Sequence, residues 1–333
     1  MQYFDTVYGS TSFTEPMILD LMQSDAIERL RRVLQHGITA VLGITRPITR
    51  FEHSVGAMIL VQRAGGSVCE QAAALMHDVS HTAFSHVADF VFSGPHSYHE
   101  EKRCEWMAQS DIPAVLSRHG VDWRDFLNDE RFPLLEQPSP RLCADRLDYF
   151  LRDSLALGIL TQVQATQLSG RLVVGAGRFA VRELDAARLF GYKYIEADQT
   201  SWSNKTAILL YELTARALRT AFDRSVIVET DLWGGDKQLW DKISQSQDTA
   251  TAASVKLILR YRDFVVDESK PDESNPDESK LTVRLQPKIR TIDPDVLTEG
   301  GMLPLSALDA EFRAYRDYYL KTRASTISLR LAD

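Results

Sequence analysis

The sequence predicts a mainly α-helical protein with a small mixed α/β part at its C-terminal end. Through the first two-thirds of the chain, apolar residues recur at three- and four-residue spacing, the period of an amphipathic helix. Later apolar residues fall in short runs rich in β-branched side chains, which favour strands. Apolar residues make up 44% of the 333 residues, enough for a sizeable core. We therefore predict a helical core at 1–222 and an α/β region at 223–333.

Glycine and proline divide the first part into separate helices. Gly65 and Gly66 follow an apolar segment that begins at Phe51, and Gly158 closes another that follows Pro140. The helices that this pattern predicts span 18–34, 51–64, 68–76, 99–109, 141–157 and 198–222.

Strands are predicted where short β-branched runs lie between turn residues. These runs are 173–174, 179–181, 225–229, 254–259 and 281–285. Between the last two lies 267–280, where a Pro-Asp-Glu-Ser unit repeats. This segment has no apolar residue beyond its prolines, so we predict a disordered acidic loop.

Composition excludes several classes of function. The formal net charge is −8 and the pI is near 5.6, which argues against non-specific binding to nucleic acid unless Arg29, Arg31 and Arg32 line one exposed face. The sequence has no apolar run long enough to span a membrane and no secretory signal at its start, which favours a cytoplasmic protein. The only cysteines, Cys69, Cys104 and Cys143, are too few and too widely spaced for a disulfide framework, so we expect buried reduced thiols.

Histidines and aspartates in three helical segments predict a divalent-metal site. His53 lies in the first, His77-Asp78 ends the second, and Asp145 lies in the third. Each alone has a simpler explanation, such as a core histidine or a surface ion pair. Together they would place several polar side chains in the protein interior, and one metal ion could bind all of them. Imidazoles with carboxylates suit Zn, Fe, Mn or Ni, and an activated water on such an ion makes phosphate esters the natural substrates.

Three further histidines, His81, His86 and His99, lie outside this minimal set. His77 and His81 stand at i, i+4, so a two-histidine zinc pair is an alternative. Near a phosphate, a histidine can also donate a hydrogen bond or act as a general acid. Each of the three is equally compatible with a surface or core position.

The ordered motifs resemble the HD-domain phosphohydrolases. They are Arg50-Phe-Glu-His53, His77-Asp-Val-Ser-His81 with Ser85-His86, His99-Glu100, and Asp145-Arg-Leu-Asp-Tyr-Phe-Leu-Arg-Asp153. The branch they resemble most is that of the deoxynucleoside triphosphate triphosphohydrolases, over roughly residues 5–220. The resemblance implies an HD-domain helical core and a divalent metal, which we expect to be Mn, Fe, Ni, Co, Zn or Mg.

The resemblance also implies roles for individual residues. The implied metal ligands are His53, His77, Asp78 and Asp145, and the implied catalytic residues are His99, Glu100 and His81. Arg50, His86 and Arg146 match residues that hold the phosphates, Gln35 and Asp153 the pair that binds the sugar hydroxyl, and Tyr149 a wall of that pocket. The family's later helix usually carries an arginine and a tyrosine. Here only Lys193 is adjacent, and Trp202 replaces the tyrosine.

Three functions therefore compete. The first is hydrolysis of (deoxy)nucleoside triphosphates at the α-phosphorus, giving nucleoside and triphosphate. The second is an HD-type nucleotidase or phosphodiesterase that acts on a monophosphate or another nucleotide, and the third is a non-catalytic nucleotide sensor. The intact ligand set argues against the third. We expect a nucleotide substrate and a homo-oligomer.

Overall fold

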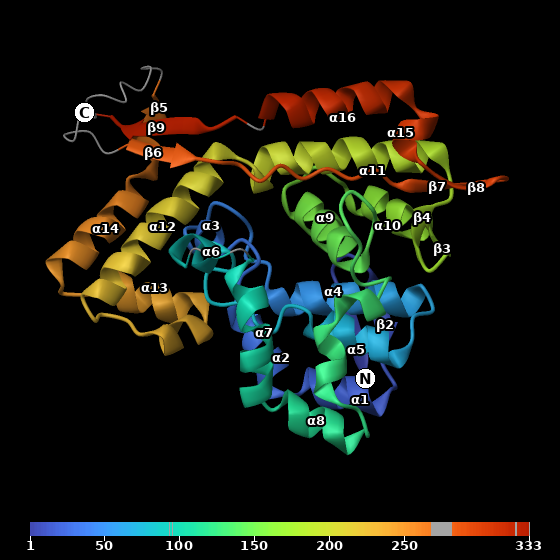
Figure 1. Ribbon diagram of the computed structural model, residues 1–333, viewed down its shortest axis with the longest axis horizontal. Coiled ribbons are helices and arrows are strands. Elements are labelled where there is room, and N and C mark those ends of the chain that lie inside the picture. The colour runs from blue at the N-terminus through green and yellow to red at the C-terminus, as the bar shows by residue number, and fades with distance from the viewer. Residues whose placement is uncertain (93, 95, 268–281, 324, 333) are drawn as a thin grey trace.

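The computed structural model describes residues 1–92, 94, 96–267, 282–323 and 325–332. The chain is mainly helical, with short strands near its N-terminus and in its last third (Figure 1). The helices are α1 (Pro16–Met22), α2 (Asp25–Arg29), α3 (Ile38–Val41), α4 (Arg50–Arg63), α5 (Val68–Met76), α6 (Val87–Val91), α7 (Tyr98–Gln109), α8 (Ile112–Arg118), α9 (Ala144–Ala156), α10 (Gln162–Gly170), α11 (Leu184–Ala197), α12 (Lys205–Asp223), α13 (Asp236–Ser244), α14 (Thr249–Leu259), α15 (Leu305–Leu308) and α16 (Ala310–Arg323). The strands are β1 (Gln2–Asp5), β2 (Gly9–Ser12), β3 (Leu172–Gly175), β4 (Arg178–Val181), β5 (Phe264–Val266), β6 (Thr282–Leu285), β7 (Asp295–Thr298), β8 (Gly301–Pro304) and β9 (Ile327–Leu331).

Helices α4, α5 and α9 form the centre of the main core. Helix α4 begins with a capping box in which Thr49 and Glu52 satisfy each other's backbone N–H groups. It ends where Gly65 takes a φ of 76°, a conformation that favours glycine. Ser67 then caps α5, which packs back against α4. Because α9 packs on α4 as well, side chains from three distant parts of the sequence meet at α4.

A second core lies between α12, α13, α14 and the antiparallel sheet β5-β9-β6. Phe84, from the segment between α5 and α6, and Val87, the first residue of α6, pack into it. The main core in turn takes up Ile292 and Phe312 from the C-terminal part of the chain. The two cores therefore exchange residues across the predicted boundary at 222, and that boundary stays a prediction.

The C-terminal part returns to the helical core. Sheet β3-β4-β7-β8 joins two strands from before residue 222 to two from after it, with β4 and β7 parallel and the outer pairs antiparallel. Helix α16 packs on α11, and the segment between β6 and β7 runs beside α11 above α9 and α10 (Figure 1). Residues from after 285 therefore lie next to the elements that carry the HD motifs.

Several sequence predictions hold and others are wrong. Helices at 51–64, 68–76, 99–109 and 141–157, and strands at 173–174, 179–181 and 281–285, are confirmed to within a few residues over their described parts. The strand predicted at 254–259 is wrong because these residues end α14, and 225–229 is a turn followed by a 3-10 helix. The helix predicted at 198–222 begins instead with a π-helical turn, Asp198–Trp202, before α12.

The acidic segment 268–280 lies outside the described residues, so its predicted disorder stays a prediction. Cys143 is buried as expected, but Cys69 and Cys104 are exposed, which corrects the prediction of three buried thiols. No helix in the described part of the chain is long and apolar enough to cross a membrane. The fold class predicted from the sequence, mainly α with a small α/β part, is confirmed.

Candidate metal centre and phosphate site

The four predicted metal ligands converge from three elements. His53 lies on α4 and is 1% exposed, whereas His77 caps the C-terminal end of α5 and is followed by Asp78. Asp145 lies in the first turn of α9. The packing of α5 and α9 on α4 brings these side chains together, although up to 92 residues separate them in sequence.

The distances between the ligand atoms match a single ion. His53 Nε2 lies 2.9 Å from Asp145 Oδ1 and 3.2 Å from His77 Nε2. His77 Nε2 lies 3.5 Å from both Asp78 Oδ1 and Asp145 Oδ1, and His53 Nε2 lies 3.7 Å from Asp78 Oδ2. Neighbouring ligands around an ion with bonds of about 2.1 Å lie roughly 3.0 Å apart in an octahedron and 3.4 Å apart in a tetrahedron. The ligand atoms of His53, His77 and Asp78 therefore lie close enough together to hold one small divalent cation, and Asp145 contacts both histidines, so that its role as the fourth ligand stays a prediction.

The second nitrogen of each imidazole is already engaged. His53 Nδ1 lies 2.8 Å from Asp148 Oδ2, and His77 Nδ1 lies 2.7 Å from the Ala74 carbonyl oxygen. Both contacts direct Nε2 of each ring toward the shared centre. This is the usual outer support of a metal-binding histidine, which fixes the ring's orientation and makes it a better ligand.

Asp148 belongs to a buried network that the sequence predictions did not assign to the site. Arg152 donates to both Asp148 oxygens at 2.9 and 3.0 Å and to Asp5 at 2.9 Å. Asp148 is 0% exposed and Arg152 3%. The sequence contained a signal for this network, because Asp145, Asp148 and Arg152 stand three and four residues apart on one helix and so can share a face. Asp5 gave no such signal.

The site carries an excess of negative charge. Burial alone would lower the pKa of His53, but hydrogen bonds to Asp145 and Asp148 raise that pKa to about 10. Burial would raise the pKa of Asp78, but Arg50 and the neighbouring histidines hold it well below its usual value. Without a metal, a proton on His53 offsets part of this charge. A bound divalent ion would do so more completely and would supply Lewis acidity and an activated water at this point.

A second cluster contains His81, His86 and His99. The His81 and His99 rings are stacked, with centroids 3.8 Å apart and an interplanar angle of 23°. Two stacked rings cannot both direct in-plane lone pairs at one ion, so this cluster is poorly suited to a second metal. His81 Nε2 lies 3.2 Å from Asp78 Oδ1, which joins the cluster to the metal centre.

The histidine cluster is built to remain neutral in the free protein. Burial, together with nearby positive charge, lowers the pKa of all three imidazoles, that of His99 to about 3. Among the described residues, His81 Nδ1 is buried without a hydrogen-bond partner. An unpartnered buried nitrogen is a favourable place for a ligand atom. Because the N–H groups of neutral His81 and His86 face Asp78 and Asp89, their other nitrogens can donate to a bound phosphate only once the rings are protonated, and the predicted roles of both residues stay predictions.

Two arginines hold the turn that carries these histidines. Arg50 donates to Asp78 Oδ2 at 2.7 Å and to Ser85 Oγ at 3.0 Å, which places it between the metal centre and the histidine cluster. Arg29 donates to the carbonyls of Val79 and His81 at 2.6 and 2.7 Å. Because Arg29 is only 7% exposed, the exposed basic face considered for nucleic acid does not form.

Arg146 contacts a loop and not the ligand cluster. It donates to the Arg141 carbonyl at 2.5 Å and to Cys143 Sγ at 3.2 Å, and it lies 3.5 Å from Glu136. These contacts hold the loop before α9 against that helix. Its predicted role in holding phosphate stays a prediction.

The predicted sugar-binding pair is only partly free. Asp153 is 1% exposed, and its two oxygens lie 3.1 Å from His36 Nε2 and 2.7 Å from Trp202 Nε1. The side-chain oxygen of Gln35 is buried without a partner among the described residues. Asp153 therefore holds Trp202 and His36 in place, while Gln35 retains an unused acceptor.

Aromatic side chains form a wall beside the metal centre. The Tyr149 ring lies 6.4 Å from the His53 ring, 5.0 Å from Trp202 and 6.1 Å from Tyr194. Tyr149 and Tyr194 are also joined through their hydroxyl groups. Trp202 reaches this wall from the π-helical turn, a distortion that often occurs at functional sites. The sequence predicted Tyr149 here but not this three-ring arrangement.

The remaining predicted residues lie nearer the surface. Glu100 is exposed in the first turn of α7, one residue after His99. Lys193 forms an ion pair of 2.8 Å with Glu196 on the same helix. Their predicted roles in catalysis and substrate binding stay predictions.

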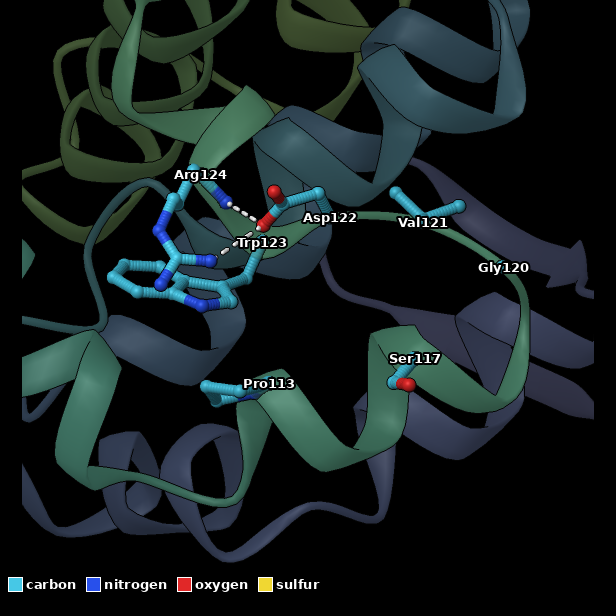
Figure 2. Close-up of a pocket in the computed structure, with 7 residues that line it drawn as sticks. All are labelled: Pro113, Ser117, Gly120, Val121, Asp122, Trp123 and Arg124. Atoms are coloured by element: carbon cyan, nitrogen blue, oxygen red, sulfur yellow. Dashed lines mark hydrogen bonds and ion pairs between the residues drawn. The ribbon is translucent and has the colours of Figure 1, made fainter.

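A hollow elsewhere on the molecule is not the candidate site. It measures about 390 Å³, lies between α8 and the following 3-10 helix, and contains Trp123 with Arg124 beside its ring (Figure 2). Its lining residues are Pro113, Ser117, Gly120, Val121, Asp122, Trp123 and Arg124. None of them is a metal or phosphate candidate from the motifs.

Comparison with known proteins agrees with the site. The chain is 35% identical over 330 residues to the metal-dependent phosphohydrolase cns2 of Cordyceps militaris, covering 96% of this chain and 92% of that protein. The chain belongs to the metal-dependent phosphohydrolases. More distantly, a putative HD domain-containing protein of Acanthamoeba polyphaga mimivirus matches 50% of this phosphohydrolase at 22% identity, in agreement with the HD superfamily. No family model matches the chain.

Other similar proteins match nearly all or all of this chain. An uncharacterized protein of Bacillus subtilis, YdhJ, is 32% identical over 315 residues and is covered to 94%. A crystal structure of a phosphohydrolase from Bacteroides thetaiotaomicron has a TM-score of 0.70 at 17% identity, with all of both chains covered. A hypothetical protein from Aquifex aeolicus has a TM-score of 0.73 at 18% identity, with all of this chain and 96% of that one covered. At these identities the structures support the fold alone.

Proposed function

We propose that this phosphohydrolase hydrolyses (deoxy)nucleoside triphosphates at the α-phosphorus and releases nucleoside and triphosphate. The observation that carries the proposal is the position of the metal centre between two different surroundings. The Tyr149 ring adjoins the ligand His53, whereas Arg50 and His81 contact the ligand Asp78. A nucleotide has matching parts, because its base and sugar suit an aromatic wall and its phosphates suit cations and N–H donors.

The protein's own groups have distinct tasks in this proposal. Arg50, already 2.7 Å from Asp78, holds a phosphoryl oxygen next to the metal centre. His99 protonates the departing oxygen. In the free protein its pKa is lowered to about 3 by burial, so it first needs a proton that a bound phosphate dianion favours by charge. His81 and His86 hold the phosphates after they take up a proton, because in the neutral rings the one N–H faces Asp78 or Asp89.

A second candidate is hydrolysis of a nucleoside monophosphate or another nucleotide. It is favoured by the contacts of Arg146 with the loop before α9, and by the engagement of both Asp153 oxygens. With those groups occupied, fewer contacts remain for a long phosphate chain and for a sugar hydroxyl. A non-catalytic sensor is disfavoured, because the ligand atoms converge at distances that suit a metal.

Product analysis distinguishes the candidates. Protein loaded with Mn, Fe, Co, Ni, Mg or Zn is incubated with dNTPs, NTPs and dNMPs, and the products are separated by ion exchange. Nucleoside with intact triphosphate supports the first candidate, and orthophosphate from monophosphates alone supports the second. The matched control is His77→Ala, which removes a metal ligand and should abolish either activity. The predicted homo-oligomer is tested by light scattering of the same preparation.

A further inference from the structure

The connector between β6 and β7, residues 286–294, is firmly anchored to the helical core. Ile292 is 1% exposed within the main core. The Asp293 backbone N–H donates to the Pro140 carbonyl at 2.9 Å, and Arg316 Nε donates to Thr291 Oγ1 at 3.0 Å. In Figure 1 the connector runs along α11 in this view, and the Arg290 backbone lies close to the Asp198 carboxylate at the end of that helix. These contacts fix the backbone directly after Arg290 relative to the site.

Arg290 is partly buried and has no acidic partner among the described residues. Arg152 and Arg178, by contrast, each contact a carboxylate at 2.9 Å or less. The Arg290 guanidinium donates to the carbonyl of Lys288, at 3.2 Å, and no acidic side chain of the described residues lies within ion-pair distance of it. A partly buried guanidinium without a carboxylate retains most of its N–H donors for another anion.

The charge of Arg290 acts on the candidate site. Its positive charge favours the ionised forms of Tyr149, Tyr194, Asp198 and Tyr211. It also disfavours protonation of His86. Arg50 acts on two of the same groups, His86 and Tyr211. The Arg290 backbone lies beside the Asp198 carboxylate, at the start of the turn that carries Trp202, so Arg290 stands next to the aromatic wall and its charge extends to His86.

We infer that Arg290 binds a phosphate group of the substrate, acting from the C-terminal connector together with Arg50. A guanidinium can hold a phosphate through two parallel N–H···O bonds, which a lysine cannot reproduce. Arg290 lies 145 residues from Asp145 in a segment outside the HD motifs, which is why the motifs do not indicate it. The inference rests on one part of the proposed function, namely that the substrate carries a phosphate group.

The test compares Arg290→Ala with Lys288→Ala, an exposed side chain two residues earlier on the same connector. Binding of inorganic tripolyphosphate to metal-loaded protein is measured by calorimetry, with Mg²⁺ in excess so that tripolyphosphate does not strip the bound ion. We expect Arg290→Ala to weaken binding roughly 10- to 100-fold, and Lys288→Ala to change it less than about threefold. Arg290→Lys should recover only part of the loss. Equal melting temperatures of the three variants exclude a folding effect.

The outcomes separate this inference from the proposed function. If Arg290→Ala binds tripolyphosphate as tightly as the unmodified protein, or if the unmodified protein does not bind it, the inference is wrong. A binding loss in a protein that cleaves no nucleoside triphosphate supports Arg290 and contradicts the proposed function alone. With an active substrate, the loss should appear chiefly in KM and should grow with the number of phosphates.

Discussion

The buried contact between Asp148 and His53 makes a specific prediction about metal affinity. Asp148→Asn keeps the size of the side chain but removes the charge that holds His53 Nδ1 at 2.8 Å. The amide can also turn its NH₂ group toward the imidazole, which favours the wrong ring nitrogen for metal binding. We therefore expect the substitution to act on the metal through His53, although Asp148 is not a ligand.

The structure sets the size of the effect. Loss of the carboxylate that supports a metal-binding histidine typically weakens metal binding by roughly 10- to 100-fold. Asp148→Asn also weakens the ion pair between residue 148 and Arg152, although Arg152 retains its ion pair with Asp5 at 2.9 Å. Removing one partner of a buried ion pair costs about 3–5 kcal/mol. Because a second carboxylate remains here, we expect a fall in the free energy of unfolding of about 1–3 kcal/mol.

The assay is competition with a fluorescent chelator, which gives the metal dissociation constant of the folded protein. Asp5→Asn is the matched control, because it disturbs the same Arg152 without touching His53. Both variants should be less stable, but only Asp148→Asn should bind metal more weakly. If the two variants bind metal equally, or if Asp148→Asn binds it as the unmodified protein does, the reasoning about His53 is refuted.

Other predictions concern metal, acid and the aromatic wall. His77→Ala should lose metal and activity together, whereas His99→Ala should retain the metal by elemental analysis and lose turnover; loss of metal from the second would contradict its role. Chelation should lower the melting temperature, and divalent ions but not NaCl should restore it. Since the pKa of His99 is lowered to about 3, the stability that its neutral form contributes is present above about pH 6.5 and is lost as pH falls. The free energy of unfolding of the metal-free protein should therefore fall less steeply with acid in His99→Gln, by up to about 1.4 kcal/mol for each pH unit. Urea melts at several pH values measure this, and an unchanged pH profile would count against it. Trp202→Phe removes the 2.7 Å hydrogen bond to Asp153, and should cost about 1.5–3 kcal/mol in a urea melt; a cost near zero would show that the bond contributes little.

The sequence predicted local structure where one signal was unopposed. Helix α5 follows from a serine cap after two glycines and an apolar run of helical length. The segment 254–259 was mispredicted because its β-branched residues indicate a strand in isolation. In the protein, these residues continue a helix that Asp248 caps six residues earlier, and its buried face packs on α12. Tertiary packing overrode the local preference there.

The same distinction applies to the site. The ligand types and their order in the motifs predicted which side chains meet, because these residues lie on helices that must pack together. The direction of Arg146, the hydrogen bond from Trp202 to Asp153 and the position of Arg290 depend on loops and on the returning C-terminal chain. No periodic pattern encodes such contacts, so the sequence did not predict them.

The charges of the buried network favour a divalent ion at this site. Four carboxylates, those of Asp5, Asp78, Asp145 and Asp148, are joined by hydrogen bonds to Arg50, Arg152 and His53. With neutral imidazoles, two arginines leave two of these four negative charges unbalanced. An uncompensated buried charge is costly, and a proton on His53 offsets only one of the two. A divalent cation at the centre of the ligand cluster balances both, so Arg152 on the outer carboxylates and Arg50 on Asp78 together determine the charge of the ion that fits the site.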